Sequence, residues 1–154
     1  ILDVPKASEG SAESFSKSTL QGDFDITVDY SLEDWKPSRD VSLSWSLFLS
    51  PVVHSEVQNL VQITHFTDEE RTEWIVNSSA RGEPTSVPAS GDRTGQLRVA
   101  RAGNRVTISQ NKAGTWQPIA TFDTTLPGTV HLGVALERQG DGGAKITLTL
   151  HPTK

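Results

Sequence analysis

The sequence predicts an all-β protein built as a two-sheet antiparallel β-sandwich, and three observations carry this prediction. Apolar and polar residues alternate with a period of two in several short stretches, as expected for strands with one buried face. These stretches recur roughly every 8–12 residues between Gly-, Pro- and Asn-rich turn signals, which is typical of all-β domains. No stretch keeps the 3.6-residue periodicity of a long amphipathic helix.

Residues 94–122 show the pattern most clearly, as three strands joined by two tight turns. Leu97 and Val99 alternate with polar residues in the first strand, and the turns contain Gly103 and Gly114, which tolerate a positive φ. Such a meander cannot cover its own apolar face. A second sheet is therefore expected to pack against it.

The other strands are expected before and after this meander, in one domain spanning residues 1–154. Their expected positions are 20–30, 41–49, 57–66, 71–77, 129–137 and 145–150. Residues 1–19 are polar and predict an irregular lead-in or a weak edge strand. Residues 78–93 contain two prolines and two glycines and are interpreted as one long loop.

Two strands should supply the centre of the core, because their apolar residues alternate regularly. The predicted row comprises Val41, Leu43, Trp45 and Leu47, facing Phe24, Ile26 and Val28.

Composition excludes several classes of function. The formal net charge of −5 argues against a nucleic-acid partner, which requires clustered Lys and Arg. No run of about 18 apolar residues is present, so no membrane-inserted helix is predicted. The chain has no cysteine, which removes disulfides, thiolate metal sites and cysteine nucleophiles.

Two segments carry a family resemblance. The strand GDFDITVDY at 22–30 is followed much later by the hairpin GQLRVARAGNRVT at 95–107 and by GTW at 114–116. In this order the segments resemble the concanavalin A-like lectin/glucanase superfamily, and within it the laminin-G-like jelly-roll modules of secreted bacterial proteins of uncharacterised function. The matching motifs are structural, so they specify a jelly-roll sandwich and name neither a ligand nor a reaction.

The resemblance implies a non-catalytic binding or adhesion module, for a carbohydrate or glycoconjugate, within a larger secreted, periplasmic or cell-surface protein. Two alternatives remain open: a divergent glycoside hydrolase and a structural spacer module. Hydrolases of this fold carry alternating acids in a Glu-x-Asp-x-x-Glu strand, and that spacing does not occur here. No catalytic residue is assigned.

The ligand site is expected around Trp74, His65 and Glu73, with residues 78–93 as a mobile rim. In jelly rolls of this superfamily the ligand commonly lies across the concave sheet, and the hairpin of 57–66 and 71–77 would line it. A tryptophan plate beside an imidazole and a carboxylate can stack a sugar ring and hydrogen-bond its hydroxyls. Trp35 is a second candidate for such a plate.

Two further interpretations concern charged residues. His65 is expected to lie across from Glu73, either as a ligand contact or as a cross-strand salt bridge on a wet face. Arg98 is the candidate for recognising carboxylated or sulfated sugars through bidentate contacts.

No cofactor and no metal site are predicted. The chain's histidines are dispersed without ligand spacing. Asp23, Asp25 and Asp29 share one strand face and could hold a calcium ion, but a solvated face that discourages edge pairing explains the same pattern.

Overall fold

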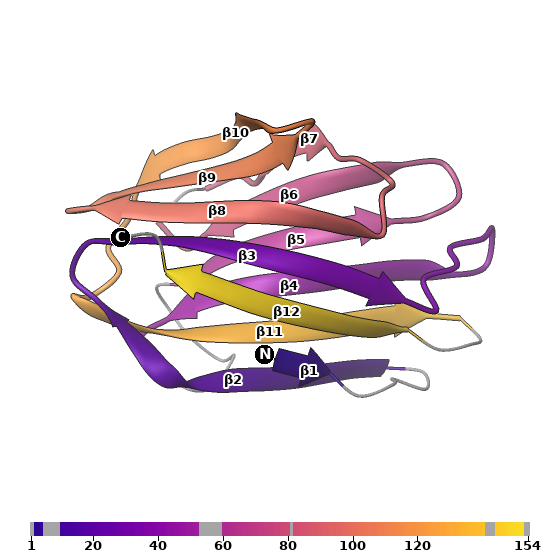
Figure 1. Ribbon diagram of the computed structural model, residues 1–154, viewed down its shortest axis with the longest axis horizontal. Helices are drawn as coiled ribbons and strands as arrows, with labels where there is room; N and C mark the ends of the chain where they lie inside the picture. Colours follow the sequence, from indigo (N-terminus) through magenta and orange to yellow (C-terminus); the bar gives the residue numbers. More distant parts are fainter. Residues whose placement is uncertain (1, 5–9, 53–59, 81, 141–143, 153–154) are drawn as a thin grey trace.

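The computed structural model describes residues 2–4, 10–52, 60–80, 82–140 and 144–152, and shows two antiparallel six-stranded sheets packed face to face (Figure 1). Sheet A contains, in spatial order, β1 (Leu2–Val4), β12 (Lys145–Pro152), β3 (Phe24–Glu33), β8 (Thr94–Ala102), β9 (Arg105–Lys112) and β10 (Thr115–Asp123). Sheet B contains β2 (Gly10–Gln21), β11 (Thr129–Gln139), β4 (Ser42–Ser50), β5 (Val61–Thr67), β6 (Thr72–Ser78) and β7 (Thr85–Pro88). The all-β sandwich predicted from the sequence is confirmed, and the described residues contain no helix.

The core lies between the two sheets and follows the alternation that the sequence displays. Leu43, Trp45 and Leu47 of β4 are buried and belong to the same cluster as Ile26 and Val28 of β3. The outermost members of the predicted row, at positions 24 and 41, are only partly buried and pack against the edge of this cluster. The central part of the row is therefore confirmed.

The meander expected at 94–122 is present as β8, β9 and β10, with Gly103 and Gly114 at positive φ in its turns. Arg101 takes an inward position in β8 and is buried. Its guanidinium donates to the carbonyl oxygens of Gly103, Leu126 and Pro127, so the charge is stabilised by backbone dipoles. This arginine fixes the segment between β10 and β11 against the end of sheet A.

One predicted strand is two strands in different sheets. The alternation across 20–30 reads as continuous, but β2 ends at Gln21 in sheet B and β3 begins at Phe24 in sheet A. Gly22, at φ 60°, makes the crossing, and its N–H donates to the carbonyl of Gly128 at 2.6 Å. Residues 10–21 form a long edge strand, so the edge-strand interpretation of the lead-in applies there.

The predicted long loop at 78–93 was wrong in part, because it contains β7. This short strand pairs with β6 through Val87 opposite Trp74 and Pro88 opposite Glu73. A four-residue strand ending in proline has little capacity to pair further, which protects this edge of sheet B. Part of the strand expected at 57–66, residues 57–59, lies outside the described residues.

Candidate functional site

The hairpin that the sequence assigns to the ligand site exists as β5 and β6, but its register differs from the expectation. His65 lies opposite Trp74, and Glu73 lies opposite Phe66. Directly opposed residues of an antiparallel pair project to the same face. His65 and Trp74 therefore point into the sandwich, whereas Phe66 and Glu73 point outward, and the expected His65–Glu73 pair does not form.

The inward residues join an aromatic cluster in the middle of the core. The ring centroids of His65 and Trp74 are 4.8 Å apart, and those of Trp45 and Trp74 are 5.5 Å apart. Tyr30 of the opposite sheet lies 5.2 Å from Trp45. Trp74 also donates its indole N–H to Gln110 of sheet A at 3.0 Å. The Tyr30–Trp45 ring contact and this hydrogen bond both join the two sheets.

These rings are buried, so a ligand in solution cannot contact them. Trp74 and His65 are each 1% exposed, and Trp35 is 4% exposed with its ring 6.3 Å from that of His65. The expectation that Trp35 and Trp74 offer exposed plates is thus wrong. The physical reason is the parity of the strand: Trp74 is in phase with Val76, and His65 with Ile63.

The ionisable members of the cluster respond to this apolar setting. Burial lowers the pKa of His65 to about 4, against a weaker opposing effect of its hydrogen bond to the Ser90 carbonyl oxygen. Burial also raises the pKa of Tyr30 to about 12, and the charge of Asp92 adds to that rise. At neutral pH both groups are uncharged parts of the core.

Glu73 and Arg98 remain at the surface, on opposite sheets. Glu73 accepts a hydrogen bond from Ser86 at 2.5 Å and pairs with Arg71 at 3.2 Å. Arg98 forms a bidentate pair with Asp25 at 2.8 and 2.5 Å, and this hydrogen bonding raises the pKa of the guanidinium. The five candidate residues thus divide among the core and two separate surfaces.

The outer face of sheet B carries a hollow in which polar side chains surround one aromatic ring. It consists of two adjoining cavities of about 190 and 320 Å³ that share Ser42, Phe66 and Gln139. We call it the Phe66 hollow. Its other lining residues are Ser38, Arg39, Asp40, Val41, Ser44, Thr64, Asp68, Glu137 and Arg138.

The floor of the Phe66 hollow is one row of side chains across the sheet. Glu137 of β11 lies opposite Ser44 of β4, which lies opposite Phe66 of β5, which in turn lies opposite Glu73 of β6. Serine between larger neighbours leaves a depression there. The predicted residue Glu73 therefore lies beside the hollow, in the row of Phe66.

A hydroxyl network continues the floor along the sheet. Ser46 and Thr64 share a hydrogen bond of 2.8 Å, and the amide of Gln62 donates to both hydroxyls at 3.1 and 3.2 Å. These groups are held in fixed orientations. Hydroxyl and amide groups of this kind exchange hydrogen bonds readily with a polyhydroxylated ligand.

Two loops raise a rim around one end of the hollow. The segment 34–41 is anchored by the buried indole of Trp35 and closed by a bridge between Ser38 and Val41. In the turn between β5 and β6, Asp68 accepts hydrogen bonds from the N–H groups of Arg71 and Glu70, at 2.9 and 2.8 Å, which lower the pKa of its carboxyl group. Both loops are thus shaped before any ligand arrives.

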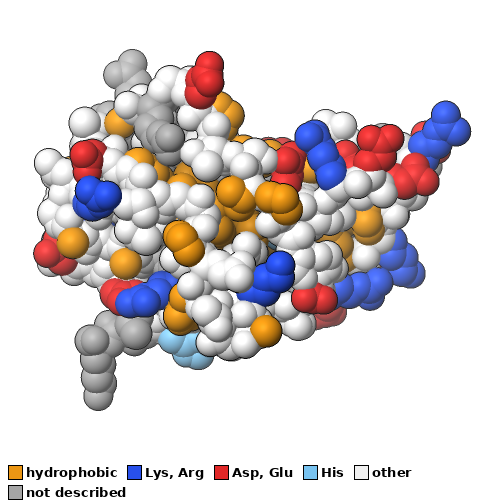
Figure 2. All heavy atoms as spheres, turned by 90° about the horizontal axis from the view of Figure 1, so that it is seen from above, with side chains coloured by type: hydrophobic (Ala, Val, Ile, Leu, Met, Phe, Trp, Pro, Cys, Tyr) orange, Lys and Arg blue, Asp and Glu red, His pale blue; other side chains and the backbone are white. Residues whose placement is uncertain are grey.

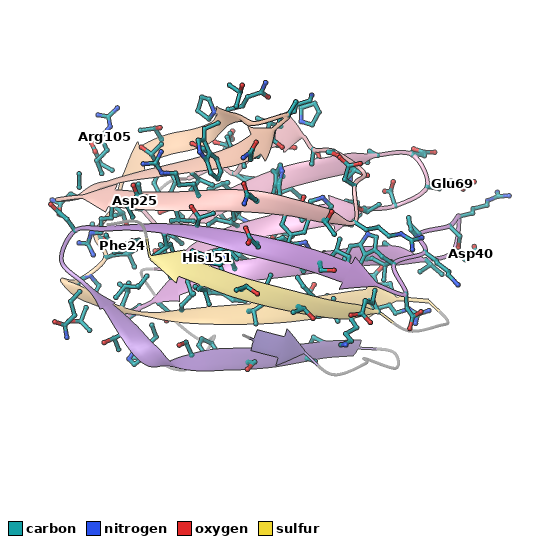
Figure 3. The ribbon with its side chains drawn as sticks, viewed as in Figure 1. Phe24, Asp25, Asp40, Glu69, Arg105 and His151 are labelled. Carbon is teal, nitrogen blue, oxygen red and sulfur yellow. The ribbon has the colours of Figure 1, made fainter. Side chains whose placement is uncertain are left out.

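Figure 3 places Asp40 and Glu69 at the same end of the sandwich, and Figure 2 shows side chains of both charge signs gathered at that end. The hollow is therefore bordered by donors and acceptors.

Phe66 is the residue that the sequence reasoning missed. Its ring lines both cavities, and the Arg71 guanidinium lies 5.2 Å from the ring centroid. The signal was present: Val61 and Ile63 define the inward phase of β5, so Phe66 is an aromatic in the outward phase. A large apolar residue in the outward phase departs from the alternation of the strand, and it is therefore more informative than the polar residues around it.

Within the described part of the chain, no group of three or more His, Asp or Glu side chains is placed to hold a metal ion. Asp23, Asp25 and Asp29 engage protein groups instead: the N–H of Gly103, the guanidinium of Arg98, and Gln96 with His151. His54 lies outside the described residues. Among the described residues there is also no helix long and apolar enough to cross a membrane.

The fold of this chain also occurs in solved structures of other proteins. No protein-family model matches the sequence, and no curated protein matches it. Solved structures do match over nearly the whole chain. One is a legume lectin-like domain from Entamoeba histolytica, with a TM-score of 0.72 and 10% identity over 98% of this chain and 82% of that one.

Two more similar structures are lectin I-B4 from Griffonia simplicifolia and the carbohydrate-binding module CBM66 from Bacillus subtilis. The lectin has a TM-score of 0.63 and 9% identity, covering 96% of this chain and 83% of the other. The module has a TM-score of 0.55 and 12% identity, covering 94% and 84%. The chain therefore shares the β-sandwich fold of these lectin-like structures, which is the fold that the resemblance to the concanavalin A-like lectin/glucanase superfamily implied.

Proposed function

We propose that this chain is a non-catalytic carbohydrate-binding module and that the Phe66 hollow is its glycan site. A sugar ring would place an apolar face against Phe66 and direct its hydroxyls to the serine, threonine and carboxylate groups of the floor and rim. This assignment keeps the predicted hairpin and Glu73 beside the site, but replaces the buried His65 and Trp74 with the outward Phe66.

The observation that carries the proposal is the composition of the hollow. An aromatic ring, hydroxyls of Ser42, Ser44 and Thr64, and the amide of Gln139 line one depression on the sheet. Such a mixture suits neutral polyhydroxylated ligands, since each hydroxyl both donates and accepts. A protein partner of ordinary interface size would require a larger apolar centre.

The similar solved structures support the same class of ligand. Two of the three are described as lectins or lectin-like and one as a carbohydrate-binding module. At about a tenth sequence identity the shared fold is the observation, and the binding role of this chain remains our proposal.

A binding role fits the carboxylates better than a hydrolytic one. A glycosidase requires a carboxylic acid whose pKa is raised so that it can protonate the leaving group. Asp68 at the rim shows the opposite, because backbone N–H groups of Arg71 and Glu70 stabilise its charged form.

We also propose that the module lies outside the cytoplasm, within a larger protein. This proposal rests on the resemblance to secreted modules.

The test is a glycan array followed by calorimetric titration of the strongest neutral oligosaccharide. Phe66→Ala should weaken binding about tenfold or more, because the ring and its contact area are lost. Ile75→Ala is the matched control: Ile75 is an outward apolar residue in the adjacent row of β6 that does not line the hollow.

Equal affinities of wild type and Phe66→Ala would reject the Phe66 hollow as the site. A folded wild type that binds no glycan would reject the function and favour the spacer alternative. Release of reducing sugar from the bound oligosaccharide would reject the non-catalytic part alone.

A further inference from the structure

The outer face of sheet A carries features that the Phe66 hollow does not use. We infer that this face is a second glycan-binding surface, which takes an extended neutral saccharide chain lying across the strands. It combines a polar ladder, an aromatic side chain at the end of that ladder, and a trough beside it. The Phe66 hollow lies on the other sheet, so the two surfaces face away from each other.

The polar ladder links four strands by side-chain hydrogen bonds. Asn111 of β9 donates to Gln96 of β8 at 2.8 Å, and Gln96 donates to Asp29 of β3 at 2.8 Å. The Nε2 atom of His151 in β12 lies 2.8 Å from the other carboxylate oxygen of Asp29. At about 4.8 Å between neighbouring strands, the ladder spans roughly 14 Å.

The ladder is fixed in place yet retains capacity for a ligand. Each amide of Asn111 and Gln96 has a second N–H, and each carbonyl and carboxylate oxygen has more than one lone pair. The protein has therefore met the ordering cost of these side chains before binding, which favours affinity. A row of alternating donors and acceptors matches the hydroxyls along a saccharide chain.

Trp116 ends this row on β10. It is directly opposite Asn111, so its side chain projects to the same outer face, and it is only half-buried. An indole beside a line of planar polar groups provides the apolar contact that a sugar ring requires. The other three tryptophans are each 4% exposed or less.

The trough runs beside the ladder over small side chains. Cavities of about 470 and 260 Å³ share Ala100 and Thr107 and so are continuous. The remaining lining residues are Asp23, Phe24, Asp25, Arg98, Arg101, Ala102, Arg105 and Ser109. Figure 3 shows Asp25 and Arg105 at one end of the molecule, away from Asp40 and Glu69 of the opposite end.

Charge selects the class of ligand. The accessible charges of the trough balance, with Arg98 and Arg105 against Asp23 and Asp25, and Arg98 pairs with Asp25. A polyanion would meet two carboxylates there, and a polycation two guanidinium groups. A neutral chain meets donors and acceptors of both kinds without net repulsion.

The inference rests on the proposed function for its ligand class but not for its location. The decisive experiment measures binding of a soluble neutral polysaccharide and of its short oligomers to the whole chain. Trp116→Ala removes the aromatic contact, and Ala100→Tyr fills the trough from a solvent-facing strand position. Ser31→Tyr is the control, since Ser31 is an outward position on β3 that lines neither cavity.

We expect Trp116→Ala and Ala100→Tyr each to weaken polysaccharide binding at the sheet A surface by about tenfold or more, because the first removes the aromatic contact and the second fills the trough. Short oligomers should bind wild type at two sites and each of these variants at one. Ser31→Tyr should match wild type in both assays.

Unchanged polysaccharide binding by both variants, with Phe66→Ala alone defective, would overturn this inference and leave the proposed function standing. The converse result, in which Phe66→Ala binds normally and the sheet A variants fail, would overturn the Phe66 hollow and support this surface. Binding that is lost equally in Ser31→Tyr would show that any bulky change on this sheet disturbs the fold, which contradicts a local site.

Discussion

The two faces of the β5–β6 hairpin contain the same kinds of residue and have opposite roles. Inside, His65 and Trp74 contact each other in a dry aromatic cluster that joins the sheets. Outside, one position along the chain, Phe66 and Glu73 lie on the floor and border of a surface hollow. An aromatic residue with a polar neighbour therefore signals a site only when the strand's phase directs it to solvent.

The largest effect should come from truncating the interior face. Trp74→Ala should reduce the free energy of unfolding by about 3–5 kcal/mol, because it opens a cavity in the core and leaves Gln110 without its partner. Urea denaturation measures this, with Phe66→Ala as the exterior control, expected to lose much less. Similar losses in both variants would contradict the assignment of the two faces.

The next effect is a pH dependence of stability caused by His65. Its folded pKa of about 4 lies below the ordinary value of 6.5, so the unfolded chain takes up the proton first as the pH falls. Stability is thus full above pH 6.5 and declines as the pH falls toward 4, by about 3 kcal/mol.

Denaturation of wild type and His65→Phe between pH 7.5 and 4.0 measures the histidine's share. The difference in unfolding free energy between the two proteins should shift in favour of the variant as the pH falls. A constant difference across that range would show that His65 titrates normally and is accessible to solvent.

A smaller loss of unfolding free energy is expected when one methyl group is added next to the aromatic cluster. A Cβ at Gly95 would lie 2.4 Å from the Tyr30 hydroxyl oxygen and 2.6 Å from Cζ of its ring. Tyr30 is enclosed by Trp45 and His65, so it cannot move aside without cost. Gly95→Ala should therefore cost about 1–3 kcal/mol, whereas Gly91→Ala, with open space around it, should cost little.

The smallest expected effect is that of metal removal. Since Asp23, Asp25 and Asp29 engage protein groups, thermal melts with and without EDTA should agree within about 2 °C. A large decrease in the chelated sample, restored by calcium, would show that the Asp23, Asp25 and Asp29 face binds the ion.

Much of the fold could be predicted from the sequence because the signals are local. The alternation of Leu43, Trp45 and Leu47 gives both the strand and its buried face, and Gly103 and Gly114 mark the turns of the meander. What failed depends on partners distant in the sequence. Gly22 joins two strands of different sheets, and β7 exists only because β6 pairs with it.

The candidate site was harder to predict for the same reason. Phe66 and Glu137 are far apart in sequence, and Ser44 brings them into one row only through the order of β11, β4 and β5. Glu73 was placed beside the proposed Phe66 hollow by its hairpin alone. The inward orientation of His65 and Trp74 could be predicted from their alternation with Ile63 and Val76. The prediction instead gave more weight to the capacity of an imidazole and an indole to bind a sugar.

The most direct test of the account is an NMR titration of the ¹⁵N-labelled chain with the neutral oligosaccharide that binds best. The account predicts that amide shifts change most at Ser42, Thr64 and Phe66, at the hollow, with a separate set near Asn111 and Trp116. Amide shift changes confined to the interior cluster would contradict a glycan site on the outer face of sheet B. Changes spread evenly over both sheets, with no group of residues changing most, would contradict it as well.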